Sequence, residues 1–272
     1  MRYLAALAGR AEVIVGLVIL VVIIGLSIVV PLVSPYDAMA SAGDPRLPPS
    51  LIHYFGTDQL GRDIFIRTFV AARLDIVLAL VAVAIPLVVG TIIGTIVGTT
   101  ENRVISSLWT IIVDAINAFP LIVLAIGVVA VIGQGVQGLV IALAATNWAR
   151  YAKIARAGAL SLREADFIQV TRVLRYSRTR VLFRHMLPNV YSAAIAYGLS
   201  DFVIVIVTVA GLSFLGLGVR PPIPEWGAMM SEGRLFLTVE WWITVFPGLL
   251  LSLTAIGVAL IADSVVGWAT GK

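Results

Sequence analysis

Long apolar runs dominate this chain and restrict what it can fold into. Six stretches of about 17 to 29 mostly apolar residues follow one another: residues 12–33, 74–98, 104–132, 138–154, 190–217 and 242–266. A helix needs about 20 such residues to cross a bilayer, and it satisfies its backbone hydrogen bonds internally. With 60% hydrophobic and 12% charged residues, the composition is far from that of a water-soluble domain. The sequence therefore predicts an all-α, polytopic membrane protein with six transmembrane helices.

These runs divide the chain into segments. We expect a cytoplasmic N-terminus over residues 1–11, a first transmembrane helix over 12–33, an external loop with an interfacial helix over 34–72, and a core domain over 73–272. The core domain holds five transmembrane helices and a cytoplasmic loop over 150–188. A cleavable signal peptide is the alternative for the first run, but its apolar core is too long for one.

Orientation follows from the basic residues. With the N-terminus inside, 13 Lys and Arg residues fall in inner segments and six in outer loops. Because inner loops carry the excess of Lys and Arg, both termini are predicted in the cytoplasm. Gly90, Gly94 and Gly98 repeat every four residues, which favours close helix packing.

The longest inner loop is amphipathic. Phe167, Val170, Thr171 and Leu174 recur at helical spacing, with charges at other positions. Such a helix either lies on the lipid surface, held by its arginines, or inserts into a groove of a cytoplasmic partner. The residues alone leave both possibilities open.

Three ordered stretches carry a family resemblance. They are Arg163–Leu174 (READFIQVTRVL) with Leu182–Asn189 (LFRHMLPN), Phe55–Asp63 (FGTDQLGRD), and Leu212–Pro222 (LSFLGLGVRPP) followed by Pro224–Gly227 (PEWG). Together they resemble the bacterial ABC importer permeases of the dipeptide, oligopeptide and nickel family, in particular the second transmembrane subunit. The resemblance covers nearly the whole chain and implies the type I importer fold in a bacterial plasma membrane.

The resemblance also implies a mechanism and partners. Dipeptides, oligopeptides or similar small solutes would cross by alternating access, driven by an ATPase that docks on the inner loop. The implied partners are a second homologous permease, two ATPase subunits or one fused ATPase, an extracytoplasmic solute-binding protein and membrane lipid. The residues implied in ATPase coupling are Glu164, Phe167, Gln169, Val170, Thr171, Leu174 and Arg175. At Arg175 the family pattern has a glycine that permits positive φ, so this chain departs from it.

ATP hydrolysis is not expected from this chain. It has no Gly-x-x-x-x-Gly-Lys-Ser/Thr phosphate loop, so ATP and Mg would be bound by partner subunits and this chain would bind no cofactor or metal. The absence of cysteine and of zinc or nucleophile motifs argues against an intramembrane enzyme. Basic residues concentrated between apolar runs argue against nucleic-acid binding.

Polar residues within or beside the runs are the remaining candidates. Asp114, Asn117 and Asp201 would line the solute path or, alternatively, satisfy contacts between helices. Buried acids would also suit an ion-coupled secondary transporter, which is the alternative function. The predicted binding-protein contacts are Asp58, Arg62, Pro222 and Trp226, although the turns around the first two would equally serve to cap the following helix.

Overall fold

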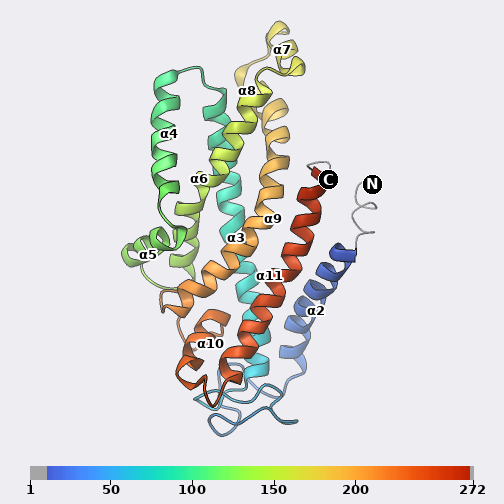
Figure 1. Cartoon of the computed structure of the whole chain (residues 1–272), viewed down its shortest axis with the longest axis vertical. Coiled ribbons are helices and arrows are strands. Elements are labelled where there is room, and N and C mark those ends of the chain that lie inside the picture. The colour runs from blue at the N-terminus through green and yellow to red at the C-terminus, as the bar shows by residue number, and fades with distance from the viewer. Residues whose placement is uncertain (1–10, 270–272) are drawn as a thin grey trace. The chain divides into compact units, whose positions relative to one another are not determined.

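The computed structural model describes residues 11–269 and is built from helices. In chain order these are α2 (Ala11–Val33), α3 (Ile64–Thr99), α4 (Arg103–Ala118), α5 (Leu121–Ile132), α6 (Val136–Leu162), α7 (Asp166–Val173), α8 (Arg178–Val181), the π-helical turn η1 (Leu182–Met186), α9 (Leu187–Phe214), α10 (Trp226–Gly233), the 3-10 turn η2 (Arg234–Phe236) and α11 (Trp242–Ala269) (Figure 1). Within the described range the extended pairing is limited to an isolated bridge between Thr57 and Asp63. The predicted all-α class is confirmed.

The helices include several that can cross a membrane. Four helical segments are long and apolar enough: 11–33, 64–99, 178–214 and 242–265. The pair α4 and α5 adds a fifth if it forms one broken span. Helix α6 is not among them because Asn147, Arg150 and Lys153 dilute its apolar character. Six spans and cytoplasmic termini therefore stay predictions, and residues 1–10 and 270–272 lie outside the described range.

The predicted third span is broken. Its two halves, α4 and α5, are bent by 94° at Phe119 and Pro120. A residue before proline is pushed out of the helical region, and Phe119 has φ −89° and ψ 143°. One run of apolar residues thus gives two helices.

The chain forms two compact units, described here one at a time. The first comprises residues up to 80, 129–140 and those from 199 on. In it α2 packs against α11, and a Cβ placed on Gly16 would meet the carbonyl oxygen of Gly257 at 2.6 Å. Phe55 stacks on Phe246 with ring centroids 4.0 Å apart. The predicted interfacial helix before residue 73 is instead the beginning of α3, which runs unbroken from Ile64.

The second unit comprises residues 81–128 and 141–198 and is centred on α6. Helix α3 packs against α6 through the predicted glycine stripe. A Cβ on Gly90 or Gly94 would collide with the carbonyl oxygens of Trp148 and Ala152, and one on Gly98 would lie 2.7 Å from the Cβ of Ala159. The predicted role of these glycines in close packing is confirmed.

Helix α6 is longer than its apolar run. It continues to Leu162, through residues that the sequence assigns to the inner loop over 150–188. The basic residues Lys153 and Arg156 therefore belong to a helix that other helices pack against. The connection that remains between α6 and α9 consists of residues 163–186.

Candidate functional site

The connection between α6 and α9, with the first turn of α9, forms the coupling segment, residues 163–190. Its short helix α7 contributes Ile168 to a cluster of buried apolar side chains. The other members are Ala155 and Ala159 of α6, Met186 of η1 and Val190 of α9. The segment is therefore part of the second unit's core on one side. Pro188 directly follows η1 within the continuous helical stretch 178–214, and it has no N–H to donate to the preceding turn.

The two faces of α7 differ sharply. Ile168 and Thr171 are buried, with 2% and 4% of their surface exposed. Phe167, Val170 and Leu174 are exposed at 45%, 53% and 56%. The predicted apolar face therefore exists without Thr171, whose hydroxyl donates to the carbonyl of Ile168.

Two further features of α7 bear on the predicted site. Val173, which the sequence reading passed over, is 82% exposed and joins the apolar face. Glu164 and Gln169 are also exposed, and the Gln169 side chain donates to the carbonyl of Glu164 at 3.1 Å. The helix is thus held on one side and leaves an apolar ridge, formed by Phe167, Val170, Val173 and Leu174, open on the other.

The turn after α7 places arginine in a backbone conformation typical of glycine. Arg175 has φ +54°, in the left-handed region that glycine adopts most easily. The N–H of Tyr176 donates to the carbonyl of Thr171 and closes this helix end. The backbone therefore keeps a glycine-type turn although the residue is arginine.

Exposed basic side chains follow the apolar ridge along the chain. Arg178, Arg180 and Arg184 are exposed on α8 and η1. The guanidinium of Arg180 lies over the ring of Tyr176, 4.1 Å from its centroid. The coupling segment therefore carries an exposed apolar ridge and, in the helical turns that follow it, exposed positive charge.

The predicted path residues lie in different places. Asp114 on α4 is half exposed, and its Oδ1 accepts from Lys153 Nζ of α6 at 2.9 Å. Asn117 donates to the carbonyl of Val113 in its own helix. Asp201 is fully buried in the first unit. Asp114 and Asn117 belong to the second unit and Asp201 to the first, so their shared role in a solute path stays a prediction. The contact of Lys153 with Asp114 was missed because Lys153 was assigned to the inner loop.

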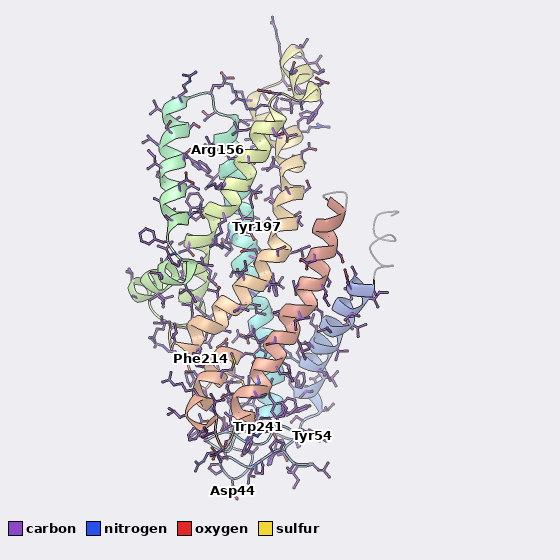
Figure 2. All side chains as sticks on the ribbon, in the orientation of Figure 1. Asp44, Tyr54, Arg156, Tyr197, Phe214 and Trp241 are labelled. Atoms are coloured by element: carbon purple, nitrogen blue, oxygen red, sulfur yellow. The ribbon has the colours of Figure 1, made fainter. Side chains whose placement is uncertain are left out.

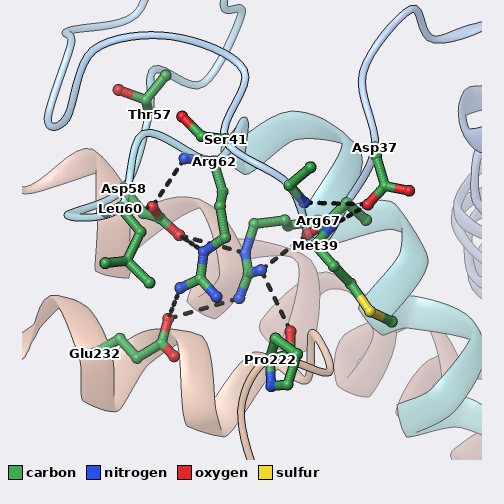
Figure 3. Close-up of polar contacts among 12 residues, drawn as sticks. Asp37, Met39, Ser41, Thr57, Asp58, Leu60, Arg62, Arg67, Pro222 and Glu232 are labelled. Carbon is green, nitrogen blue, oxygen red and sulfur yellow. Dashed lines mark hydrogen bonds and ion pairs between the residues drawn. The ribbon is translucent and has the colours of Figure 1, made fainter.

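A buried ion network lies in the first unit, and we call it the Asp58 network (Figure 3). It consists of Asp58, Arg62, Arg67 and Glu232. Asp58 accepts from Arg62 Nε at 2.6 Å, and Arg62 also donates to Glu232 at 2.8 Å. Two arginines balance two carboxylates, so the network is neutral and ties the loop, α3 and α10 together.

The four residues predicted to contact a binding protein differ in burial. Asp58, Arg62 and Trp226 are buried, while Pro222 is exposed. Asp58 accepts from Arg62, and the Trp226 indole N–H donates to the carbonyl of Thr68, so these three side chains complete their contacts within the chain. The structural alternative for this turn is supported instead, and the actual cap of α3 is Asp63, whose Oδ1 accepts from the N–H of Ile66.

Two buried carboxyl groups meet at the start of α10. Asp75 accepts from the N–H of Trp226, and Glu225 caps the helix by accepting from Gly227 and Ala228 at 3.0 and 2.7 Å. Burial raises the pKa of Glu225, and the two N–H donors oppose only part of that rise. Sequence reasoning missed this pair, although Pro224-Glu225-Trp226-Gly227 had drawn attention as a motif.

Together, the apolar helices and the exposed ridge of α7 define a multi-pass membrane protein with an amphipathic segment between two of its helices. Comparison with known proteins narrows this class. Residues 90–270 match the family described as the binding-protein-dependent transport system inner membrane component. The dipeptide transport system permease protein DppC of Alkalihalophilus pseudofirmus is 38% identical over 251 residues, which cover 92% of this chain and 82% of that relative. The glutathione transport system permease protein GsiD of Escherichia coli is 39% identical over 236 residues, covering 85% and 77%.

The chain therefore belongs to the family of inner membrane components of binding-protein-dependent transport systems. It is the membrane permease component of an ABC transport system in a bacterial inner membrane. The ion-coupled carrier finds no support in these relatives.

Proposed function

We propose that this chain forms one half of the channel of a peptide importer and that the ridge on α7 is where a partner ATPase docks. The observation that carries the docking proposal is the division of α7 into a buried face and an exposed apolar face. A helix exposing Phe167, Val170, Val173 and Leu174 to water is unfavourable by itself, so a groove that covers this ridge gains free energy.

The partners and solute follow from the family. The relatives named above are permeases for a dipeptide and for glutathione, so short peptides are the proposed solute. A second, homologous permease would complete the channel, and a solute-binding protein would deliver the peptide from outside. ATP and Mg would be held by two ATPase subunits or one fused ATPase. The coupling segment and both termini would then lie in the cytoplasm, as the distribution of basic residues predicts.

Copurification tests the docking proposal. The chain is solubilised in mild detergent with the proteins encoded beside it, as wild type and as the double variant Phe167→Asp and Leu174→Asp. We expect the ATPase to copurify with the wild type and to be lost from the variant, because two carboxylates would be desolvated in an apolar groove. The second permease should remain bound to both.

A matched control separates docking from charge. Ser161→Asp with Thr179→Asp adds the same two negative charges at exposed polar positions of the same region. This control should keep the ATPase. Full retention of the ATPase by the Phe167 and Leu174 variant, or equal loss in the control, would refute docking on the ridge.

Substrate class needs its own measurement. Proteoliposomes containing the whole complex, a solute-binding protein and internal ATP should accumulate a labelled dipeptide. Competition by unlabelled glutathione, by a longer peptide and by a free amino acid then ranks the solutes. Uptake that none of the peptides reduces would refute a peptide substrate while leaving the docking proposal intact.

A further inference from the structure

A row of polar contacts joins α4 to α6 inside the second unit. The Arg156 guanidinium donates to the hydroxyl of Ser106 at 2.6 Å and lies over the Trp109 ring at 5.0 Å. One turn of α6 earlier, Lys153 pairs with Asp114. As residue numbers rise along α4 they fall along α6, so the contacts follow two antiparallel helices, seen side by side in Figure 1. We call these five residues the α4–α6 seam.

Arg156, labelled in Figure 2, lies on α6 where both α3 and α4 contact that helix. On the turn of α6 that carries it, α3 approaches so closely that a Cβ on Gly98 would lie 3.0 Å from the Arg156 carbonyl oxygen. The side chain of the same residue reaches α4. A single turn of α6 therefore contacts α3 through its backbone and α4 through the seam.

The coupling segment uses another face of the same stretch of α6. Ala155 and Ala159 are fully buried and contribute to the cluster with Ile168, Met186 and Val190. Ala155 and Arg156 are neighbours in sequence, so the contact with the coupling segment and the contact with α4 lie at the same level of α6. Close-packed interiors transmit displacement with little give.

The seam contributes little to stability by the usual measure. Lys153 and Asp114 have side chains that are 62% and 51% exposed, and ion pairs this exposed contribute little to stability. Its position is more informative than its strength. Asp114 lies six residues before Pro120, where the chain turns by 94° between α4 and α5. The seam therefore holds the half of the broken helix that precedes the bend.

We propose that the α4–α6 seam passes movement of the coupling segment to α4, with Arg156 and the Lys153–Asp114 pair as positioning residues. This inference rests on the proposed docking of the ATPase on α7. When the docked segment moves, α6 moves with it as one packed body. The seam makes α4 follow, so that α4 swings against α5 at Phe119 and Pro120.

The experiment measures ATP hydrolysis and peptide uptake on the same proteoliposomes, made with the whole complex. It uses wild-type complex from which the ATPase is known to copurify, so that failure of the docking proposal shows before this measurement begins. The variants are Arg156→Leu, which keeps bulk but removes the donors, Lys153→Asp, and the exchange Lys153→Asp with Asp114→Lys. Arg103→Leu, which removes an exposed charge from α4 outside the seam, is the matched control.

We expect Arg156→Leu and Lys153→Asp to keep ATPase copurification, melting temperature and hydrolysis while peptide moved per ATP falls by roughly fivefold or more, the usual size of coupling between sites. The exchange should restore most of the ratio, and the control should match the wild type. The proposal is overturned if the ratio is unchanged in both variants, or if it falls only together with loss of the ATPase. A Lys153→Asp defect that the exchange fails to relieve would also overturn the role of the ion pair.

Discussion

The Asp58 network and the coupling segment treat their side chains in opposite ways. Around Asp58, three buried charged side chains and the partly buried Glu232 neutralise one another, although charged residues are usually exposed. On α7, four apolar side chains face outward, although apolar residues are usually buried. Both come from stretches that drew attention in the sequence as motifs. The comparison teaches that one motif completes its contacts within the chain and the other leaves them open for a partner.

The strongest way to break this comparison is Asp58→Ala. Asp58 accepts from two backbone N–H groups and from Arg62, and lies 3.5 Å from Arg67 Nε. Its removal leaves two buried arginines with one carboxylate, which should lower the free energy of unfolding by about 3–5 kcal/mol. Thermal denaturation of the detergent-solubilised protein measures it.

The control for this variant is Glu240→Ala, which removes an ion pair to the half-exposed Arg46 at 3.6 Å. Its cost should stay below about 1 kcal/mol. Equal melting of the two variants would mean that water reaches the Asp58 network.

A second prediction sharpens the contrast within α7. Ile168→Ala removes a buried side chain from the cluster on α6 and should cost about 2–4 kcal/mol. Val170→Ala, one helical face away and 53% exposed, should leave the melting temperature nearly unchanged and weaken retention of the ATPase. Melting temperature and ATPase copurification, both measured on each variant, test this division. Similar melting shifts for both would show that the ridge is not free in the isolated chain.

A third prediction concerns pH. Because burial raises the folded pKa of Glu225 above its unfolded value, the stabilisation belongs to the protonated form. It is present below the unfolded pKa of about 4.3 and is lost as pH rises through the folded pKa. The free energy of unfolding should therefore fall over that window, by at most about 1.4 kcal/mol per pH unit for one proton. Melting temperatures recorded across the same pH range should fall with it.

Asp75→Asn tests the cause of this pH dependence. The carboxyl groups of Asp75 and Glu225 meet at the start of α10, and an amide at position 75 offers Glu225 a donor at every pH while its oxygen still accepts from Trp226. The variant should flatten the curve. A curve as steep as that of the wild type would assign the pH dependence to other groups.

Much of this architecture is readable from sequence because local rules decide it. Apolar runs predicted the helices, and the spacing of Gly90, Gly94 and Gly98 predicted close packing, since both depend on neighbours along one helix. The break at Phe119 was missed because a run of apolar residues has the same composition whether it is straight or bent. Only Pro120 signalled it, and proline also occurs within the intact helices α3 and α11.

The site was harder to predict because it depends on partners distant in sequence. Helical spacing placed Thr171 with Val170 on one face, yet Thr171 is buried and Val170 is exposed. The pairing of Arg62 with Glu232 spans 170 residues, and no local pattern announces it. Lys153 and Arg156 were assigned to a cytoplasmic loop, because positive charge beside an apolar run usually marks a loop. Their contacts with another helix could not be predicted from that pattern.

The smallest predicted effect returns to the turn after α7. Arg175 at φ +54° pays a backbone penalty that glycine would not, so Arg175→Gly should raise the free energy of unfolding by about 0.5–1 kcal/mol after the added chain entropy is counted. Arg178→Gly, at the first position of α8, removes an equal charge from a right-handed position and should cost a similar amount. Opposite shifts in melting temperature would establish the strain.

If Arg175→Gly instead lowers stability, the arginine side chain stabilises the fold by more than its backbone conformation destabilises it. Arg175→Asn then separates the two effects, since asparagine tolerates the left-handed region without the guanidinium. Retention of the ATPase by both the Gly and Asn variants would show that the partner meets the apolar ridge and not this arginine.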